Sequence, residues 1–181
     1  MPALRIPVIV AVAIIIVAAA VIYAPRRTPD SASARADVLK GGTLRTDMTQ
    51  HSIPLDQILD GGPGKDGIPA LIDPASTDIA HADPAIQKSD GILVFVGDET
   101  RFYPYNIIVW HEIVNDTVGG KHLIITFCPL CGSAIVFEAE VEGKPEIFGV
   151  SGKLYNSNLL MYDAATESLW SQIEGEAVVG E

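Results

Sequence analysis

The two cysteines of this 181-residue chain lie three positions apart, at Cys128 and Cys131 in the stretch CPLCG. Two sulfurs at this spacing can cycle as a dithiol, hold one side of a metal ion, or form a short structural disulfide. The residues that follow, Val136, Phe137 and Val141 among them, alternate as in a strand rather than with a helical period. We therefore predict a turn between two strands, with both sulfurs at its tip, instead of the helix N-terminus of thioredoxin-like proteins.

The residues within this turn favour thiolates. Pro129 fixes φ after the first cysteine, and Gly132 permits a positive φ that aims backbone N–H groups at the sulfurs. Such donors stabilise the thiolate, which is the form that binds metals. A closed zinc site needs four ligands, so one cysteine pair requires histidine or carboxylate ligands from elsewhere. Sulfur with imidazole suits copper(I) or zinc, and these are the metal ions that we predict if one binds.

Among the four histidines, we predict that His111 completes the site with Cys128 and Cys131. His111 lies in the stretch WHE, where Glu112 or the nearby Asp116 could supply an oxygen ligand or orient the imidazole. His122 begins the strand that leads to Cys128 and is too far along it to join the site. A lone histidine can equally be structural or merely exposed, so a metal site, a redox pair and an inert disulfide all stay open from spacing alone.

The elements around these residues predict a mainly β fold of antiparallel strands with short helices. The first third of the domain is rich in turns, with glycine and proline clusters at 61–67 and 72–76, and one short helix is expected over 54–59. Further along, we predict a hairpin over 91–104, a short helix or strand over 105–114, a turn over 115–121, strands over 121–127 and 134–141, and two short strands within 159–172.

A transmembrane helix is predicted before this domain. Residues 6–23 carry no charge and span about 27 Å as a helix, which is close to the bilayer core. We assign 1–24 to an N-terminal anchor, with a cleaved signal peptide as the alternative, 25–37 to a linker, and 38–181 to the folded domain. The protein is thus expected in the cell membrane, attached through a single pass, with its domain outside the cytoplasm.

The domain is strongly acidic. Residues 37–181 contain eight basic and 22 acidic side chains, a balance of −14. Such a surface repels phosphate backbones, so we predict no nucleic-acid partner. The sequence leaves a protein partner or a small-molecule ligand unknown.

Several motifs resemble the DUF3179 family of bacterial and archaeal proteins: DGIPA from Asp66, the run from Trp110 to Phe137, and the stretch from Gly149 to Gln172. The resemblance covers roughly 60–181. It implies exported or membrane-attached proteins without an established activity, and relatives that continue further, so that this chain would be truncated at its C-terminus. The polar residues in these motifs are His111, Glu112, Asn115, Asp116, Cys128, Cys131, Ser133, Ser151, Lys153, Tyr155, Asn156, Asp163, Trp170, Ser171 and Gln172.

We therefore expect a Cys128, Cys131 and His111 site that binds a transition metal or cycles as thiols. The alternative is a binding or scaffold domain with a structural disulfide, and whether the protein is an enzyme stays open. The residues expected to surround these ligands or to line a groove beside them are Glu112, Asp116, Ser133, Ser151, Lys153, Tyr155, Asn156 and Asp163. A hydrolase is disfavoured because Lys153 stands where the nucleophile elbow around Ser151 requires glycine.

Overall fold

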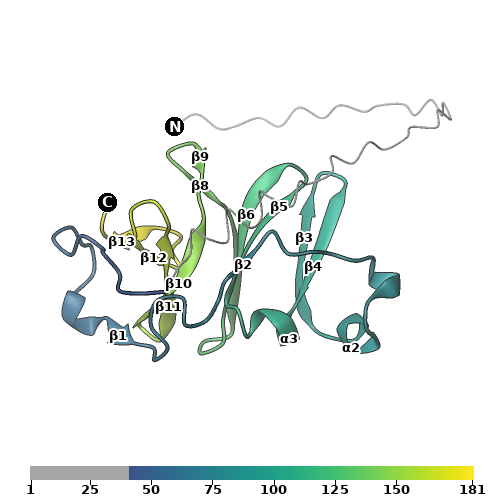
Figure 1. Cartoon of the computed structure of the whole chain (residues 1–181), viewed down its shortest axis with the longest axis horizontal. Helices are drawn as coiled ribbons and strands as arrows, with labels where there is room; N and C mark the ends of the chain where they lie inside the picture. Colours follow the sequence, from purple (N-terminus) through teal and green to yellow (C-terminus); the bar gives the residue numbers. More distant parts are fainter. Residues whose placement is uncertain (1–40) are drawn as a thin grey trace, which may run out of the picture.

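The computed structural model describes residues 41–181, which form a mainly β fold. Two sheets pack face to face, and a β-hairpin covers the outer side of one of them (Figure 1). The predicted anchor (1–24) and linker (25–37) lie outside the described residues. Within 41–181 we find no helix with the length and apolarity that a membrane span requires.

The larger sheet has five strands in the order β1-β10-β11-β12-β13. They are β1 (Leu59–Asp60), β10 (Phe148–Tyr155), β11 (Asn158–Asp163), β12 (Leu169–Ser171) and β13 (Ala177–Val179). The smaller sheet, in the order β2-β5-β6-β7, consists of β2 (Leu71–Ile72), β5 (Ile113–Val118), β6 (Lys121–Cys128) and β7 (Ser133–Glu138). Two separate ladders pair β3 (Gly91–Val96) with β4 (Glu99–Pro104) and β8 (Glu140–Val141) with β9 (Lys144–Pro145). Among the described strands β2 and β5 pair in parallel, and the other pairs are antiparallel.

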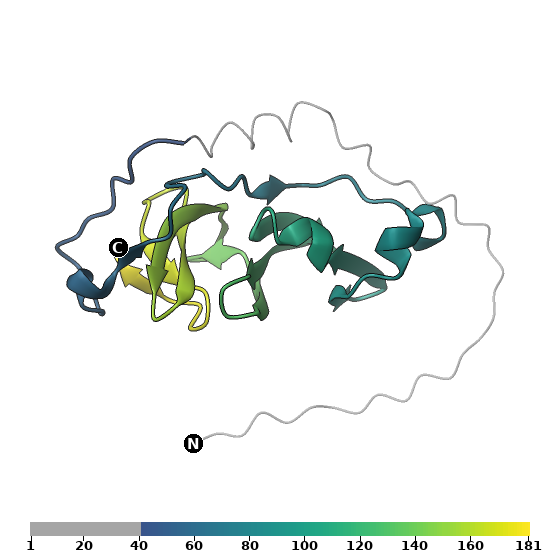
Figure 2. The same ribbon diagram turned by 90° about the horizontal axis from the view of Figure 1, so that it is seen from below.

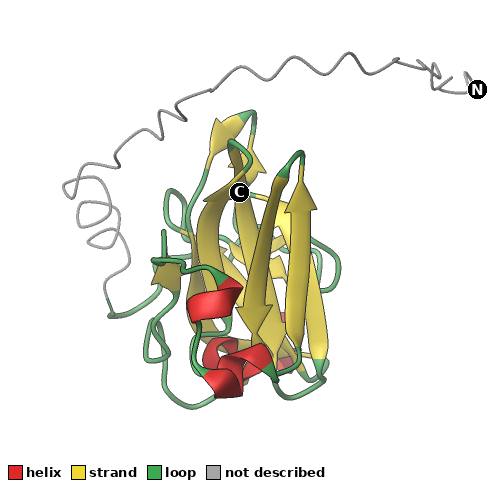
Figure 3. Ribbon diagram, turned by 90° about the vertical axis from the view of Figure 1, so that its right-hand side faces the viewer, coloured by secondary structure: helices red, strands yellow, loops and turns green. Residues whose placement is uncertain are grey.

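Helical segments are short and gather toward one end of the strands (Figure 3). They are η1 (Leu55–Gln57), η2 (Ile79–His81), α2 (Pro84–Gln87) and α3 (Tyr105–Ile108). The chain between β1 and β3, which contains β2, η2 and α2, runs along one side of both sheets (Figure 2). Its dense glycine and proline content explains why β1 and β2 are only two residues long.

Alternating side chains divide the apolar residues into three layers. In β6, Ile124 and Cys128 face the core between the two sheets, whereas Leu123 and Ile125 face the β3–β4 hairpin and α3. In β11, alternate residues likewise face the inter-sheet core and the segment of 44–58 that packs on the outer side of the larger sheet. Both strands are therefore buried on two sides, which accounts for their nearly continuous apolar sequences.

A buried amide joins the two sheets. Asn115 on β5 accepts a hydrogen bond from the Phe148 N–H on β10 at 2.8 Å and donates one to the Phe148 carbonyl at 2.8 Å. Its amide group also lies 3.4 Å from the Leu71 carbonyl oxygen. One side chain thus satisfies both backbone groups of a strand residue, as a neighbouring strand would do.

Most predicted elements are confirmed. The 91–104 hairpin turns at the predicted Gly97, the strands on either side of the cysteines are β6 and β7, and 105–114 contains both a helix, α3, and the start of β5. The predicted turn over 115–121 is wrong. Strand β5 continues through Asn115 and Asp116 because these polar side chains are buried with partners, and the chain turns only at Gly119 and Gly120.

Asn115→Ala should lower the free energy of unfolding by about 2–4 kcal/mol, because it leaves the buried N–H and C=O of Phe148 without partners. Urea unfolding measures the change. Asn106→Ala, at an exposed position of α3, is the matched control and should change stability by less than about 0.5 kcal/mol. Equal losses in the two variants would contradict the role of Asn115.

Candidate functional site

The two cysteines lie on the turn between β6 and β7. Cys128 is the last residue of β6 and pairs with Ser133, the first residue of β7. Gly132 has a φ of 68°, and its N–H donates to the Cys128 carbonyl at 2.8 Å. The predicted hairpin with the cysteines at its tip is confirmed, and glycine has the predicted positive φ.

The two sulfurs occupy different environments. Cys128 is fully buried within the inter-sheet core, whereas Cys131 is exposed. Both are free thiols that share a hydrogen bond, so the structural disulfide of the alternative interpretation is not formed. The pair therefore consists of one accessible and one protected thiol.

A polar network converges on the accessible sulfur. The Cys131 Sγ lies 3.0 Å from the Ser133 Oγ and accepts a hydrogen bond from the Asn158 Nδ2 at 3.3 Å. Asn158 begins β11 of the larger sheet, so both sheets contribute to the surroundings of the thiol. Gln172, directly after β12, accepts hydrogen bonds on its Oε1 from Ser133 at 2.7 Å and from Asn158 at 2.6 Å.

The orientation of the Gln172 amide follows from the contact that its Nε2 makes with Thr126. The Thr126 hydroxyl donates its proton to the Ile135 carbonyl at 2.8 Å, so it can only accept from the Gln172 Nε2 at 3.0 Å. The Gln172 oxygen must then point toward Ser133 and Asn158. Because Gln172 is fully buried, this arrangement satisfies an amide that has no access to water.

These contacts separate the acidities of the two thiols. Burial alone would raise the pKa of Cys131, but hydrogen bonds from Ser133, Asn158 and Cys128 outweigh it and lower this pKa to about 7. Burial raises the pKa of Cys128, although the backbone N–H groups of Cys131, Leu159 and Leu130 partly offset it. The exposed sulfur is thus the more acidic of the two and loses its proton more readily near neutral pH, whereas the buried sulfur favours the protonated form.

His111 does not join the cysteines. Its Nδ1 lies 2.8 Å from the Pro69 carbonyl oxygen, on the segment that precedes β2. In residues 41–181 no group of three or more histidine, cysteine, aspartate or glutamate side chains could hold a metal ion. The predicted set of Cys128, Cys131 and His111 is therefore not assembled, since the His111 imidazole bonds the Pro69 carbonyl instead.

The two acidic candidates near His111 are not among the hydrogen-bond partners of the thiols, and the Glu112 carbonyl instead accepts the Phe127 N–H at 2.8 Å. Glu112 adopts a φ of 59° just before β5, and burial raises its pKa. Asp116 is buried on β5, where it accepts a hydrogen bond from the Tyr103 hydroxyl at 2.9 Å and lies 3.5 Å from Arg101. Asp116 therefore serves the packing of the β3–β4 hairpin and does not orient His111.

The candidates on β10 have structural partners. Ser151 is fully buried and bonds the Leu160 carbonyl and the Lys153 N–H, where the β10–β11 register shifts. The Lys153 ammonium lies 3.4 Å from an Asp60 carboxylate oxygen. Tyr155 ends β10 half-buried, and Asn156 has the positive φ of a hairpin turn. Ser151, Lys153 and Asp163 thus have separate partners and form no common polar cluster, which agrees with the absence of a nucleophile elbow around Ser151.

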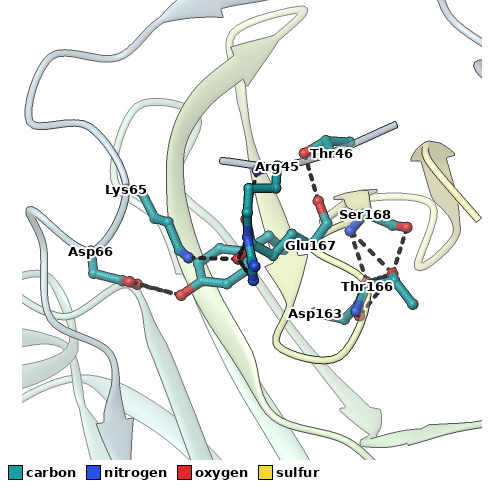
Figure 4. A network of polar contacts seen from close by, with 9 residues as sticks. Arg45, Thr46, Lys65, Asp66, Asp163, Thr166, Glu167 and Ser168 are labelled. Atoms are coloured by element: carbon teal, nitrogen blue, oxygen red, sulfur yellow. Dashed lines mark hydrogen bonds and ion pairs between the residues drawn. The ribbon is translucent and has the colours of Figure 1, made fainter. Parts of the chain in front are cut away.

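Asp163 lies in a second polar network, on the turn between β11 and β12 (Figure 4). It accepts hydrogen bonds from Thr166, Ser168 and the Trp170 indole. Next to it, Glu167 binds the Arg45 backbone N–H, the Arg45 guanidinium and the Lys65 ammonium, at 2.6–3.1 Å. This network attaches the segments on both sides of β1 to the β11–β12 turn and is accounted for by structure alone.

Sequence reasoning found one residue of the Cys131 network, Ser133, and missed Asn158, Thr126 and Gln172 as site residues. Gln172 was noticed within a family motif but given no role. Asn158 stands 27 residues from Cys131 and carries no local signal, because only the pairing of the two sheets brings it to the sulfur.

The comparisons with known proteins identify a family whose function is unknown. A family model described as "Protein of unknown function (DUF3179)" matches residues 65–181 and confirms the resemblance. No curated protein matches the chain, and no solved structure matches it either.

The rate of Cys131 alkylation by iodoacetamide should rise with pH to a plateau, with its midpoint near pH 7, since the thiolate is the nucleophile. Ser133→Ala removes a stabilising hydrogen bond and should move the midpoint up, toward the value of about 8.5 for an ordinary cysteine. Ser76→Ala, at an exposed loop position, is the control and should leave the profile unchanged. A midpoint in Ser133→Ala equal to that of the wild type would refute this role.

Stability should fall in acid through Glu167. Burial would raise its pKa, but the hydrogen bonds from Arg45 and Lys65 outweigh burial and lower it to about 2. Because this is below the value of about 4.3 in the unfolded chain, the stabilisation is complete above pH 4.3 and is lost as the pH falls toward 2.

Glu167→Gln should therefore be less stable than the wild type at pH 7, with the difference shrinking between pH 4.3 and 2. Urea unfolding across this range provides the measurement, with Glu174→Gln as an exposed control. A difference that is constant with pH would show that the charge of Glu167 is not responsible.

Proposed function

We propose that this chain, which belongs to the DUF3179 family, is a thiol–disulfide exchange protein in which Cys131 attacks and Cys128 resolves. The observation that carries the proposal is the exposed Cys131 sulfur, held by Ser133 and Asn158 beside a buried second thiol. An inert pair requires no network of buried amides around one sulfur. The family itself contributes no activity, so the proposal depends on this site.

The exchange would begin at Cys131. Its thiolate attacks one sulfur of a substrate disulfide, forms a mixed disulfide and displaces the other substrate sulfur as a thiolate, which takes up a proton. The Ser133 hydroxyl and the Asn158 amide lie within bonding distance of the attacking sulfur. Ser133 can turn its proton from Gln172 to Cys131 as negative charge develops there, because Asn158 continues to satisfy the Gln172 oxygen.

Cys128 would complete the reaction. It loses its proton, attacks the Cys131 Sγ of the mixed disulfide and releases the second substrate thiol, so that the Cys128–Cys131 disulfide forms. Two protein thiols are oxidised and one substrate disulfide is reduced. A second dithiol would return the pair to its reduced form. Burial protects Cys128 from competing reactions, and the N–H groups that face its sulfur stabilise the thiolate at this step.

The order of the two cysteines is the reverse of the thioredoxin arrangement. There the attacking sulfur is the first of the pair at the start of a helix, whereas here the second cysteine is the accessible one. The difference follows from the hairpin, because the last residue of β6 points into the core and the turn carries Cys131 outward.

Metal binding stays a prediction. Two thiolates with copper(I) or zinc would require further ligands, and in the part of the chain that the structure describes no third histidine, cysteine or carboxylate joins them. We also propose the predicted location, with attachment to the cell membrane through residues 6–23 and the domain outside the cytoplasm. Regeneration there would depend on a membrane or extracytoplasmic dithiol.

The neutral disulfide 4,4′-dithiodipyridine tests the exchange. Reduced wild-type protein should release two equivalents of thiopyridone and finish with an internal disulfide and no adduct. Cys128→Ser should release one equivalent and keep a pyridylthio group on Cys131, as measured by intact mass. Cys131→Ser should react at least about tenfold more slowly, since Cys128 is buried.

A wild-type protein that keeps two adducts, or equal reactivity of the two single variants, would contradict the mechanism. Metal analysis of the same anaerobic samples serves as a control. Stoichiometric copper or zinc that is lost in both variants would favour the metal interpretation instead.

A further inference from the structure

A cavity lies away from the thiols, beside the β3–β4 hairpin. It has a volume of about 1110 Å³, is open to solvent on one side, and is bordered by the 74–89 segment, by β4 and α3, and by Leu93 of β3. Small-molecule sites typically measure about 300–1,000 Å³. Its lining includes neither cysteine and no member of the Cys131 network, so it is a separate feature of the fold.

Part of its wall is apolar and uncovered. Leu93, Ile79 and Ile107 all line the cavity, although 52%, 54% and 39% of their surfaces are exposed. They come from β3, η2 and α3, and they converge on one hollow. Phe95 is more exposed, at 69%, on the same face of β3, but it lies outside the cavity. An apolar group that filled the cavity would cover the first three side chains and leave Phe95 in water.

The charges of the cavity are mostly negative. Asp78, Asp83, Glu99 and Asp116 contribute carboxylates, and the nearby cation, Arg101, is already held by two of them. Its guanidinium lies 2.7 Å from Glu99 and 3.5 Å from Asp116. An anion would have to displace these carboxylates, whereas a cation would meet the remaining negative charge. The described residues as a whole carry a balance of −14, which adds to this preference.

We propose that this cavity binds a small organic cation with an apolar body, such as an aryl- or alkylammonium compound. The apolar part lies against Leu93, Ile79 and Ile107, and the ammonium group lies toward Asp78 and Asp83 at the rim. These two aspartates each accept one N–H as helix N-caps, at 2.8 and 2.7 Å, so they are fixed in position.

Ligand-observed NMR with the full chain tests the proposal, using benzyltrimethylammonium and the matched anion phenylmethanesulfonate. The cation should bind, and the sulfonate should bind at least about tenfold more weakly. Asp78→Asn together with Asp83→Asn removes the charges but keeps N-cap side chains, and should weaken the cation about fivefold at low salt. Added salt should reduce that difference.

Leu93→Ser should weaken the cation about threefold or more, whereas Phe95→Ser, on the same strand, should leave its affinity unchanged. Sulfonate binding as tight as that of the cation would overturn the proposal. So would equal effects of Leu93→Ser and Phe95→Ser, or no detectable binding of the cation at about 10 mM.

Discussion

The arrangement of the thiol site depends on the buried amide of Gln172, whose oxygen and nitrogen both need hydrogen-bond partners within the protein. Thr126 already donates to a backbone carbonyl, so it can only accept from Gln172, and this fixes which way the Gln172 oxygen points. That oxygen accepts a hydrogen bond from one N–H of the Asn158 amide. The other N–H of this amide is then available to the Cys131 sulfur. The Asn158 hydrogen bond, which helps to lower the pKa of the exposed thiol, therefore depends on a contact made deep between the sheets, because a buried amide cannot turn without losing partners.

Because the Gln172 amide needs partners on both sides, the thiol site is made of residues from both sheets. Thr126, Ser133 and both cysteines come from the β6–β7 hairpin, whereas Asn158 and Gln172 come from the larger sheet. Asn115 joins the sheets elsewhere by pairing with both backbone groups of Phe148. The two amide contacts and the apolar core together fix the spacing between the sheets, and this spacing places Asn158 at bonding distance from the sulfur.

Local patterns predicted the parts of this structure that depend on neighbouring residues. The cysteine turn, the Gly97 hairpin and the mainly β architecture follow from turn residues and period-two alternation. The sequence predicts a turn where β5 continues, because asparagine and aspartate are common in turns. Only the buried partners of Asn115 and Asp116 show that these two residues belong to the strand. His111 is predicted beside the cysteines from its place in the WHE stretch, but the fold places its imidazole against the Pro69 carbonyl instead. Asn158 could not be found from spacing, since its contact with Cys131 exists only after the two sheets pack.

The segment that precedes β1 shows that a family boundary and a folding boundary differ in this chain. The family match begins at residue 65, yet Ile53 and Leu55 complete the apolar layer on the outer side of the larger sheet. Backbone bonds from Ser52 and to Gln50 extend the β13 edge, and Arg45 holds Glu167. A polypeptide trimmed to the family limits would expose the Leu160 and Tyr162 side of β11 to water. Its solubility would then suffer although every residue of the thiol site remained.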